Sequence, residues 1–360
     1  GIDPWLGWLA DRVPRPTMVA LALLPFASGF VALLNPPAEN AALWLIGSLT
    51  LTYVGFSAAS VAYQAWGVDI GPTSGLRTRL TAAREGFGLL GVVLAAALPV
   101  LLASDLDTGI ARLSWVLPPL LLIAAATTFS RVGVGQPVPA ASQPLWPSLR
   151  RVMADSAFRR LLAVSSFSRL LPASAAPGIA SALPATLFLF FVADVLQQEK
   201  ASGPLLALYF VAGAASLPLW VKLSARFGRV RAWLGAIVLS IVAFAGASQL
   251  GSDDLALFAV ICIASGLVLG ADLALPAAIA ADLGERQGQA GACFGVWNLV
   301  AKLNLALAAG LALPLLALLC YVPGSGEGLA SLTFAYALLP LGFKALAGLL
   351  LWRWRHSLEI

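Results

Sequence analysis

The sequence predicts an all-α protein that crosses a lipid membrane many times. Hydrophobic residues make up 60% of the 360 residues and charged residues only 11%, against about 25% charged in an ordinary soluble domain. Apolar runs of spanning length recur along the chain, and the polar connections between them alternate in charge. A single water-soluble core cannot bury this much apolar surface, so we expect a polytopic membrane protein.

Ten apolar runs are long enough, or nearly long enough, to cross a membrane, which takes about 17–25 residues. The two shortest, 87–102 and 115–129, need flanking residues to span. Residues 1–10 are predicted to be the end of a further helix, so the chain, which begins at Gly1 without a methionine, is expected to be N-terminally incomplete and to have twelve spans at full length. The ten runs are 17–34, 42–68, 87–102, 115–129, 177–196, 204–223, 232–250, 255–275, 291–316 and 329–352.

Basic residues concentrate in alternate loops, and the loops between these carry mostly acidic residues. By the positive-inside rule the first loop and the C-terminus are cytoplasmic, and we expect a bacterial inner membrane. The net charge of +5 therefore reports topology and does not indicate a nucleic-acid partner. Seventeen of the 22 Lys and Arg residues lie in the basic loops: Arg12, Arg15, Arg77, Arg79, Arg84, Arg131, Arg150, Arg151, Arg159, Arg160, Lys222, Arg226, Arg229, Arg231, Arg286, Arg353 and Arg355.

A polar, proline-rich connection divides the spans into two groups. It predicts an N-terminal helical bundle at 1–130, a cytoplasmic linker at 131–158 and a C-terminal bundle at 159–360. Interruptions by Arg169 and prolines within 161–177 predict a kink or an amphipathic lead-in to the next span. The loop at 7–15 recurs loosely at 222–229, so the bundles are predicted to be parallel, pseudo-symmetric repeats, an arrangement typical of transporters.

The run 291–316 carries a lysine near its middle. Lys302 lies roughly 16 Å past Gly291 along a helix, at a depth where a charge costs at least ~2.5 kcal/mol. Helical spacing places Gly291, Gly295, Asn298 and Lys302 on one stripe: two small residues that allow close helix contact, an amide, and the charge. Lys302 either pairs or snorkels for structural reasons, or it lines the path of a solute or ion.

A carboxylate lies at comparable depth near the start of the chain. Asp3 precedes Asp11, at the membrane edge, by roughly 12 Å. Binding a cation or pairing with Lys302 would relieve the cost of burying it. We predict that Asp3 and Lys302 form the cation-coupling pair and approach within a few ångströms in at least one state. A second intramembrane lysine, Lys344, either pairs internally or snorkels.

Several motifs occur together along the chain. Asp3-Pro4 precedes the loop with Gly7, Asp11, Arg12 and Arg15, in which Pro14 replaces an expected glycine. The other motifs are Ala62-Tyr63-Gln64-Ala65-Trp66-Gly67-Val68-Asp69, Arg77-Thr78-Arg79-Leu80 leading to Arg84-Glu85, and Ala281-Asp282 before the helix of Lys302. In this combination the chain resembles the major facilitator superfamily, and more specifically its glycoside-pentoside-hexuronide:cation symporters, the melibiose-permease-like family.

This resemblance implies a secondary active transporter that takes up a sugar or glycoside-like solute with a cation by alternating access of two bundles. It implies no cofactor other than the coupling ion, Na⁺ or H⁺, and a monomer in the bilayer. Ser60 stands where some members carry an acid, and the family's first helix falls before Gly1, so the ion stays open. The alternative is a major facilitator exporter or importer of another small polar or amphipathic solute.

The candidate site residues fall into two groups. For the substrate, Tyr63, Trp66 and Trp297 either stack on a sugar ring or serve helix packing, Arg84 by resemblance reaches solute hydroxyls or else anchors the helix, and Asn298 supplies an amide. For gating, Asp11, Arg12 and Arg15 by resemblance form a cytoplasmic latch, and Arg226 and Arg229 take the equivalent place in the second half; surface solvation is the alternative for these charges.

Enzyme chemistry is not indicated. The single His356 lies at the tail, and Cys262, Cys293 and Cys320 stand in apolar runs without metal-ligand spacing, so no nucleophile, base or metal set is apparent. Gly86-Phe87-Gly88-Leu89-Leu90-Gly91 spells a dinucleotide-binding fingerprint but follows no strand and lies in a membrane helix, which favours helix packing. No phosphate-binding loop of the ATPase type occurs, so an ATP-driven pump is not expected.

Overall fold

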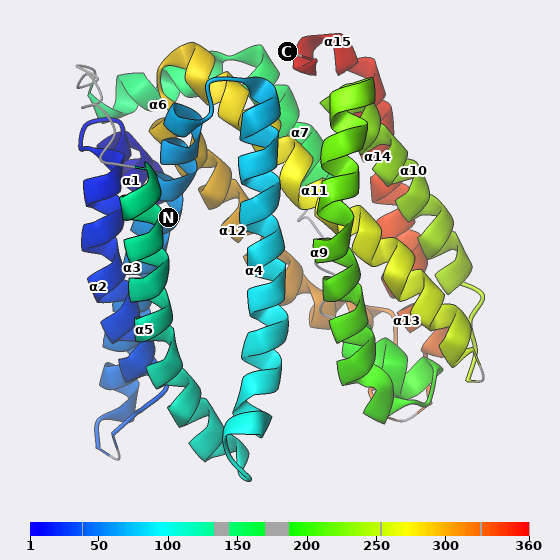
Figure 1. Ribbon diagram of the computed structural model, residues 1–360. Helices are drawn as coiled ribbons and strands as arrows, with labels where there is room; N and C mark the ends of the chain where they lie inside the picture. Colours follow the sequence, from blue (N-terminus) through cyan, green and yellow to red (C-terminus); the bar gives the residue numbers. More distant parts are fainter. Residues whose placement is uncertain (38, 133–143, 170–186, 253, 325, 360) are drawn as a thin grey trace. The chain divides into compact units, whose positions relative to one another are not determined.

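The computed structural model describes residues 1–37, 39–132, 144–169, 187–252, 254–324 and 326–359 (Figure 1). Regular structure within these ranges is helical, without strands. Nine helical segments of the described chain are long and apolar enough to cross a membrane. The predicted all-α, polytopic membrane fold is therefore confirmed.

The helices follow one another with short connections. In the first part of the chain they are α1 (Asp3–Ala10), α2 (Arg15–Leu33), α3 (Ala41–Ile70), α4 (Ser74–Leu102), α5 (Leu106–Val132) and α6 (Leu145–Ala154). In the second part they are α7 (Ser156–Arg169), η1 (Phe191–Val195), η2 (Glu199–Ala201), α9 (Ser202–Phe227), α10 (Arg229–Ala247), α11 (Leu255–Gln287), α12 (Ala290–Leu318), α13 (Leu329–Thr333), η3 (Phe334–Leu338), α14 (Leu339–Arg353) and α15 (Arg355–Leu358).

Some predicted boundaries shift in the structure. The two short runs, 87–102 and 115–129, do take flanking residues, because α4 starts at Ser74 and α5 at Leu106. The expected linker contains a helix, α6, that was not predicted. Residues 133–143 of that linker, the first half of the predicted span 177–196 (residues 177–186) and the lead-in beyond Arg169 lie outside the described residues.

Packing groups the described chain into two units. Unit one comprises Gly1–Arg77, Gly91–Asp155 and Ala280–Leu299, and unit two comprises Thr78–Leu90, Ser156–Ile279 and Val300–Ile360. Helices α4, α11 and α12 therefore contribute to both units. The bundles predicted at 1–130 and 159–360 with the linker 131–158 stay a prediction.

Unit one is built around α2 and α3, which pack along each other, with α5 against α2 and α1 against α3. Phe26 of α2 meets Phe56 of α3, with ring centroids 5.6 Å apart. The Asn35 amide, just beyond α2, donates to the Ser114 hydroxyl of α5 at 2.9 Å. Apolar contacts supplemented by single side-chain hydrogen bonds are the usual means of joining membrane helices.

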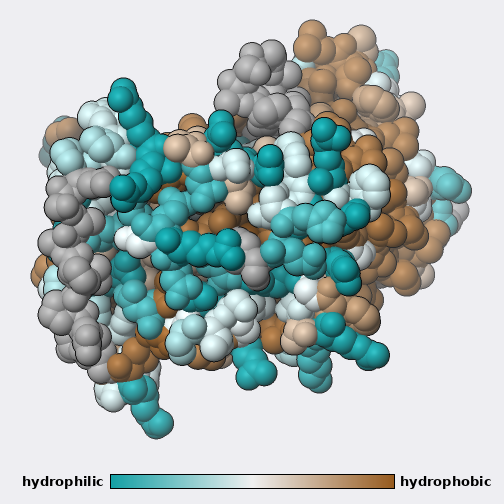
Figure 2. Space-filling model, turned by 90° about the horizontal axis from the view of Figure 1, so that it is seen from above, coloured by the Kyte–Doolittle hydropathy of each residue, from teal (hydrophilic) through white to brown (hydrophobic). Residues whose placement is uncertain are grey.

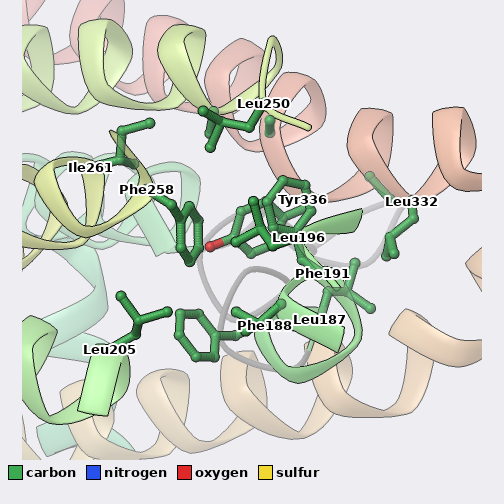
Figure 3. Close-up of a cluster of buried hydrophobic side chains, with 14 of the residues drawn as sticks. Leu187, Phe188, Phe191, Leu196, Leu205, Leu250, Phe258, Ile261, Leu332 and Tyr336 are labelled. Carbon is green, nitrogen blue, oxygen red and sulfur yellow. The ribbon is translucent and has the colours of Figure 1, made fainter. Parts of the chain in front are cut away.

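Unit two has an aromatic core between two π-helical turns, η1 and η3 (Figure 3). The rings of Phe191 in η1 and Tyr336 in η3 stack, with centroids 4.2 Å apart. Phe258 of α11 packs on both rings. Elsewhere in this unit α10 packs against α14, and α14 against α7.

Candidate transport and gating residues

Asp11 of unit one caps a helix that is distant in sequence. Its carboxylate, 2% exposed, accepts hydrogen bonds from the backbone N–H groups of Gly291 at 2.7 Å and Ala292 at 2.8 Å. These groups belong to the first turn of α12, where N–H groups lack partners within their own helix and the helix dipole favours a negative charge. The Asp11 side chain thus joins the α1–α2 loop to the start of α12.

Close contact between α1 and α12 depends on glycine. A Cβ atom on Gly7 would lie 2.2 Å from the carbonyl oxygen of Gly291, and one on Gly295 would lie 2.5 Å from that of Asp3. Larger side chains at these positions would force the helices apart. The prediction that Gly291 and Gly295 allow close helix contact is therefore confirmed, and the partner is α1.

Arg15 connects the same loop to α3. Its guanidinium, in a side chain that is almost fully buried, donates to both Asp11 and Asp69 and to the carbonyl oxygen of Ala65 at 2.9 Å. Burial raises the pKa of the Asp11 carboxyl above its usual value, whereas the N–H groups of Ala292 and Gly291 and the charge of Arg15 act to lower it. Several partners around each charge offset the cost of removing these groups from water.

A second ion network in unit one joins the first turn of α4 to the end of α11. Arg77 donates through Nε to Asp282 and through Nη2 to Glu285, each at 2.6 Å, and through Nη1 to the carbonyl oxygen of Gly71 at 3.0 Å. Asp282 and Glu285 are three residues apart and so share one face of α11. Both networks lie at helix ends.

Two amides meet deeper in unit one. Gln64 of α3 donates through Nε2 to Oδ1 of Asn298 in α12 at 3.4 Å. Among the described residues, Oε1 of Gln64 and Nδ2 of Asn298 are buried without a hydrogen-bond partner. If the O and N atoms of both amides are exchanged, Asn298 becomes the donor and Gln64 the acceptor. One carbonyl oxygen and one amino group are then still without a partner. An unsatisfied buried polar group costs about 1–3 kcal/mol, so this pair is suited to a ligand that both donates and accepts.

The predicted stacking residues differ in exposure. Trp66 is 2% exposed and stacks on Phe129 with centroids 5.7 Å apart, and Trp297 is also buried. Tyr63 is 42% exposed and meets Trp66 edge-on. Of these three, Tyr63 has the most ring surface available to a ligand, and the packing of Trp66 matches the alternative given for it. Their role at the substrate stays a prediction.

The other predicted arginines make local contacts. Arg84 forms an ion pair with its neighbour Glu85, and Arg12 lies over the ring of Trp8 at 3.8 Å. In unit two, Arg226 lies over the ring of Phe227 at 5.2 Å, and Arg229 donates to the carbonyl oxygen of Ala278 at 3.1 Å. These contacts leave the roles of the four arginines a prediction.

Asp3 and Lys302 belong to different units. Asp3, 2% exposed, opens α1 in unit one, and Lys302 is half-buried on the part of α12 that belongs to unit two. Their pairing stays a prediction.

Unit two contains a buried ion pair, and only one of its two residues, the lysine, was identified from the sequence. Lys344 of α14 pairs with Asp272 of α11, and the indole N–H of Trp233 in α10 donates to the other carboxylate oxygen at 2.9 Å. Of the two alternatives for Lys344, internal pairing is confirmed. Asp272 was missed although it lies within the predicted run 255–275, where the rule that singled out Lys302 also applies.

Five polar residues of unit one that were not predicted as site residues have partners distant in sequence. They are Gln64, Asp69, Arg77, Asp282 and Glu285. The first four belong to the sequence motifs given above, and Glu285 lies outside them. No role was predicted for these residues, because the motifs do not show which helix ends meet.

Within the described residues, nine helices long and apolar enough to span, with ion networks at helix ends, indicate an integral membrane protein. The profile of the family described as MFS/sugar transport protein matches residues 2–357. The chain belongs to this family, so the resemblance to the major facilitator superfamily is confirmed, and the family consists of transporters and not enzymes.

Solved structures show the same fold at low sequence identity. A bacterial homologue of the iron transporter ferroportin is 17% identical with a TM-score of 0.68, over 99% of this chain and 87% of that one. The Escherichia coli fucose:proton symporter FucP is 14% identical with a TM-score of 0.65, over 99% and 87%. The human organic anion transporter MFSD10 is 17% identical with a TM-score of 0.61, over 97% and 80%. No curated protein matches this chain significantly in sequence.

Proposed function

We propose that this protein is a secondary active transporter that carries a sugar or glycoside-like solute together with a cation by alternating access. The family match supports transport of a small solute across a membrane, and its description names sugar transport. The observation that carries the sugar assignment is the amide pair of Gln64 and Asn298, with one free acceptor and one free donor.

A sugar fits this pair because each hydroxyl group both donates and accepts hydrogen bonds. The free Gln64 carbonyl would accept from one hydroxyl, and the free Asn298 amino group would donate to another. Tyr63, next to Gln64 in the chain, offers an exposed ring on which a sugar face can stack. A site built to bind hydroxyls rejects analogues that lack them, because its buried polar groups then stay unpaired.

The coupling hypothesis links this pair to Asp3 and Lys302. Lys302 follows Asn298 by four residues and so lies one turn further along the same face of α12. A cation arriving at Asp3 competes with Lys302 for the carboxylate, and the lysine then changes partners beside the solute-binding amide. Binding of cation and solute thereby favours the same conformation.

For the gate, we assign Asp11 and Arg15 to a latch on the first turn of α12. The Asp11 carboxylate accepts hydrogen bonds from two backbone N–H groups of α12 and from the guanidinium of Arg15. A group at a helix end can exchange these partners for water during a conformational step, which suits a contact that forms and breaks in each cycle.

The proposal is tested with the protein in proteoliposomes, by measuring uptake of a panel of radiolabelled sugars under separate Na⁺ and H⁺ gradients. We expect accumulation of at least one sugar under one gradient. Gln64→Ala should weaken sugar binding about 10-fold or more, as expected for loss of a hydrogen bond and an unpaired partner, and Gln249→Ala, at an exposed glutamine, should not. Sugar-independent accumulation or expulsion of an amphipathic solute would favour the alternative transporter.

The coupling pair has its own test. Asp3→Asn, Lys302→Met and the double variant are compared for folding and for solute counterflow. Each single variant should be more impaired in folding than the double one, because a lone buried charge is costlier than none. Full cation-coupled uptake by Lys302→Met would show that this lysine is structural and that the coupling mechanism is wrong.

A further inference from the structure

Helix α6, which follows the first bundle, has two unlike faces. Ser148 and Val152 are buried, and Leu145 and Leu149 are half-buried, at the spacing of one helical stripe. This stripe faces unit one, where α6 packs on α1. The remaining side chains of α6 are exposed in the part of the chain that the structure describes.

The outer face combines an aromatic ring with positive charge. Trp146 is 71% exposed and Met153 41% exposed, and Arg150 and Arg151 are exposed as well. Among the described residues, neither arginine takes part in an ion pair. The nearest acid in sequence, Asp155, accepts a hydrogen bond from Gln287 at 3.0 Å.

The position of α6 is at the ends of membrane-spanning helices. It follows α5, which ends at Val132, and Asp155 at its C-terminal end is held by Gln287, the last residue of α11. Figure 2 looks onto the end of the molecule at which α6 lies in Figure 1, and hydrophilic residues gather there. Residues 131–160 contain five arginines and one aspartate, a net charge of +4.

We propose that the outer face of α6 binds anionic lipid headgroups of the membrane in which the transporter lies. Tryptophan partitions to the boundary between headgroups and acyl chains, and the apolar stem of arginine lies there while its guanidinium reaches phosphate. Trp146 and Met153 insert at this boundary, and Arg150 and Arg151 bind the phosphate groups. A basic amphipathic helix of this kind lies in the membrane surface and responds to its charge.

Charge complementarity and position favour lipid over a soluble acidic protein. A soluble partner would neutralise the arginines, but the exposed Trp146 ring would then need an apolar pocket on that partner. The membrane supplies both the apolar layer and the negative charge at the level where spanning helices end. α6 would thereby make the transporter sensitive to lipid composition.

The test places an environment-sensitive fluorophore on α6 of the full chain. Met153→Cys is made in a Cys320→Ser background, since Cys262 and Cys293 are buried, and the labelled protein is reconstituted in vesicles of phosphatidylcholine alone or with phosphatidylglycerol. We expect a blue-shifted emission only in the anionic vesicles, quenching by nitroxide-labelled lipid, and loss of the shift in high salt, which screens charge.

Charge variants distinguish specific binding from general attraction. Arg150→Gln with Arg151→Gln should remove most of the shift, and Arg150→Lys with Arg151→Lys should keep it. The matched control, Arg79→Gln with Arg353→Gln, neutralises two exposed arginines elsewhere and should also keep it. Equal emission in both vesicle types, an unchanged shift after the glutamine substitutions, or a probe quenched only from water would overturn the proposal.

Discussion

Asp11 of unit one and Asp272 of unit two are both buried and both have a basic partner, but the two aspartates are held in different ways. Asp11 in unit one lies between two helices, and two of its three described bonds come from backbone N–H groups of α12. Asp272 in unit two lies inside a helix, 17 residues after its first residue and 15 before its last. Its described partners, Lys344 and Trp233, are side chains of two other helices.

This difference determines what each group can do. Water reaches helix ends, so the Asp11 contact can open without leaving a charge in hydrocarbon. Asp272 is roughly 22–26 Å from either end of its helix, and opening its ion pair would strand a carboxylate and an ammonium at membrane depth. We expect the first to change during transport and the second to hold α10, α11 and α14 together throughout.

The largest effect is expected for breaking the Asp272 pair. Asp272→Asn or Lys344→Met alone leaves one uncompensated buried group and should lower the free energy of unfolding by about 3–5 kcal/mol. The double variant should lose less stability than Asp272→Asn, which retains the buried lysine without its partner. Thermal unfolding in detergent measures this, with Asp107→Asn, an exposed acid, as the control. A double variant that unfolds more easily than either single one would contradict a purely electrostatic origin.

A smaller effect is expected for separating α1 from α12. Gly7→Ala places a methyl group against the backbone of Gly291, and overpacking of this kind typically costs about 1–3 kcal/mol. Because the helices must move apart, the two amides bound by Asp11 should also exchange hydrogen faster. Gly235→Ala, where the added methyl group meets open space, should change neither quantity, and an unaltered exchange rate in Gly7→Ala would show that the Asp11 contact does not depend on this close approach.

The smallest effect on stability is expected for Asp11→Asn. The amide oxygen still accepts from one backbone N–H group of α12, so the free energy of unfolding should fall by about 1 kcal/mol. Turnover should change more than stability, since the charge that favours the latched conformation is gone. The comparison fails if Asp11→Asn alters unfolding as strongly as Asp272→Asn while leaving the transport rate unchanged.

The sequence predicts the membrane spans well because hydropathy acts within each helix. It also places Gly291, Gly295 and Asn298 on a contact face, since helical periodicity alone fixes that stripe. It does not show that Gly7 meets Gly291 or that Arg15 reaches Asp69, because such contacts depend on how distant helices pack. The short helix α6 was missed since its prolines and arginines suggested a linker, and the helix is only ten residues long.

The candidate site could be predicted only in part for the same reason. Charges in apolar surroundings stand out one at a time, as Lys302 and Lys344 do, but the partner decides whether such a charge is functional or structural. Loop similarity between the halves suggested that Arg226 and Arg229 repeat the role of Arg12 and Arg15. Among the described contacts, Arg12 and Arg226 each lie over an aromatic ring, whereas Arg15 pairs with two aspartates and Arg229 donates to a carbonyl oxygen. A shared role of the two loops therefore stays a prediction.

The π-helical turn η3 has a consequence for comparing this chain with its relatives. A π turn holds one more residue than the same path through an α-helix, and η3 continues directly into α14. Removing its inserted residue would rotate α14 by about 100°. Alignments with relatives that have a regular helix here must open a one-residue gap within Phe334–Leu338. Without that gap, Lys344 and every other residue of α14 would be compared with the wrong face of the corresponding helix.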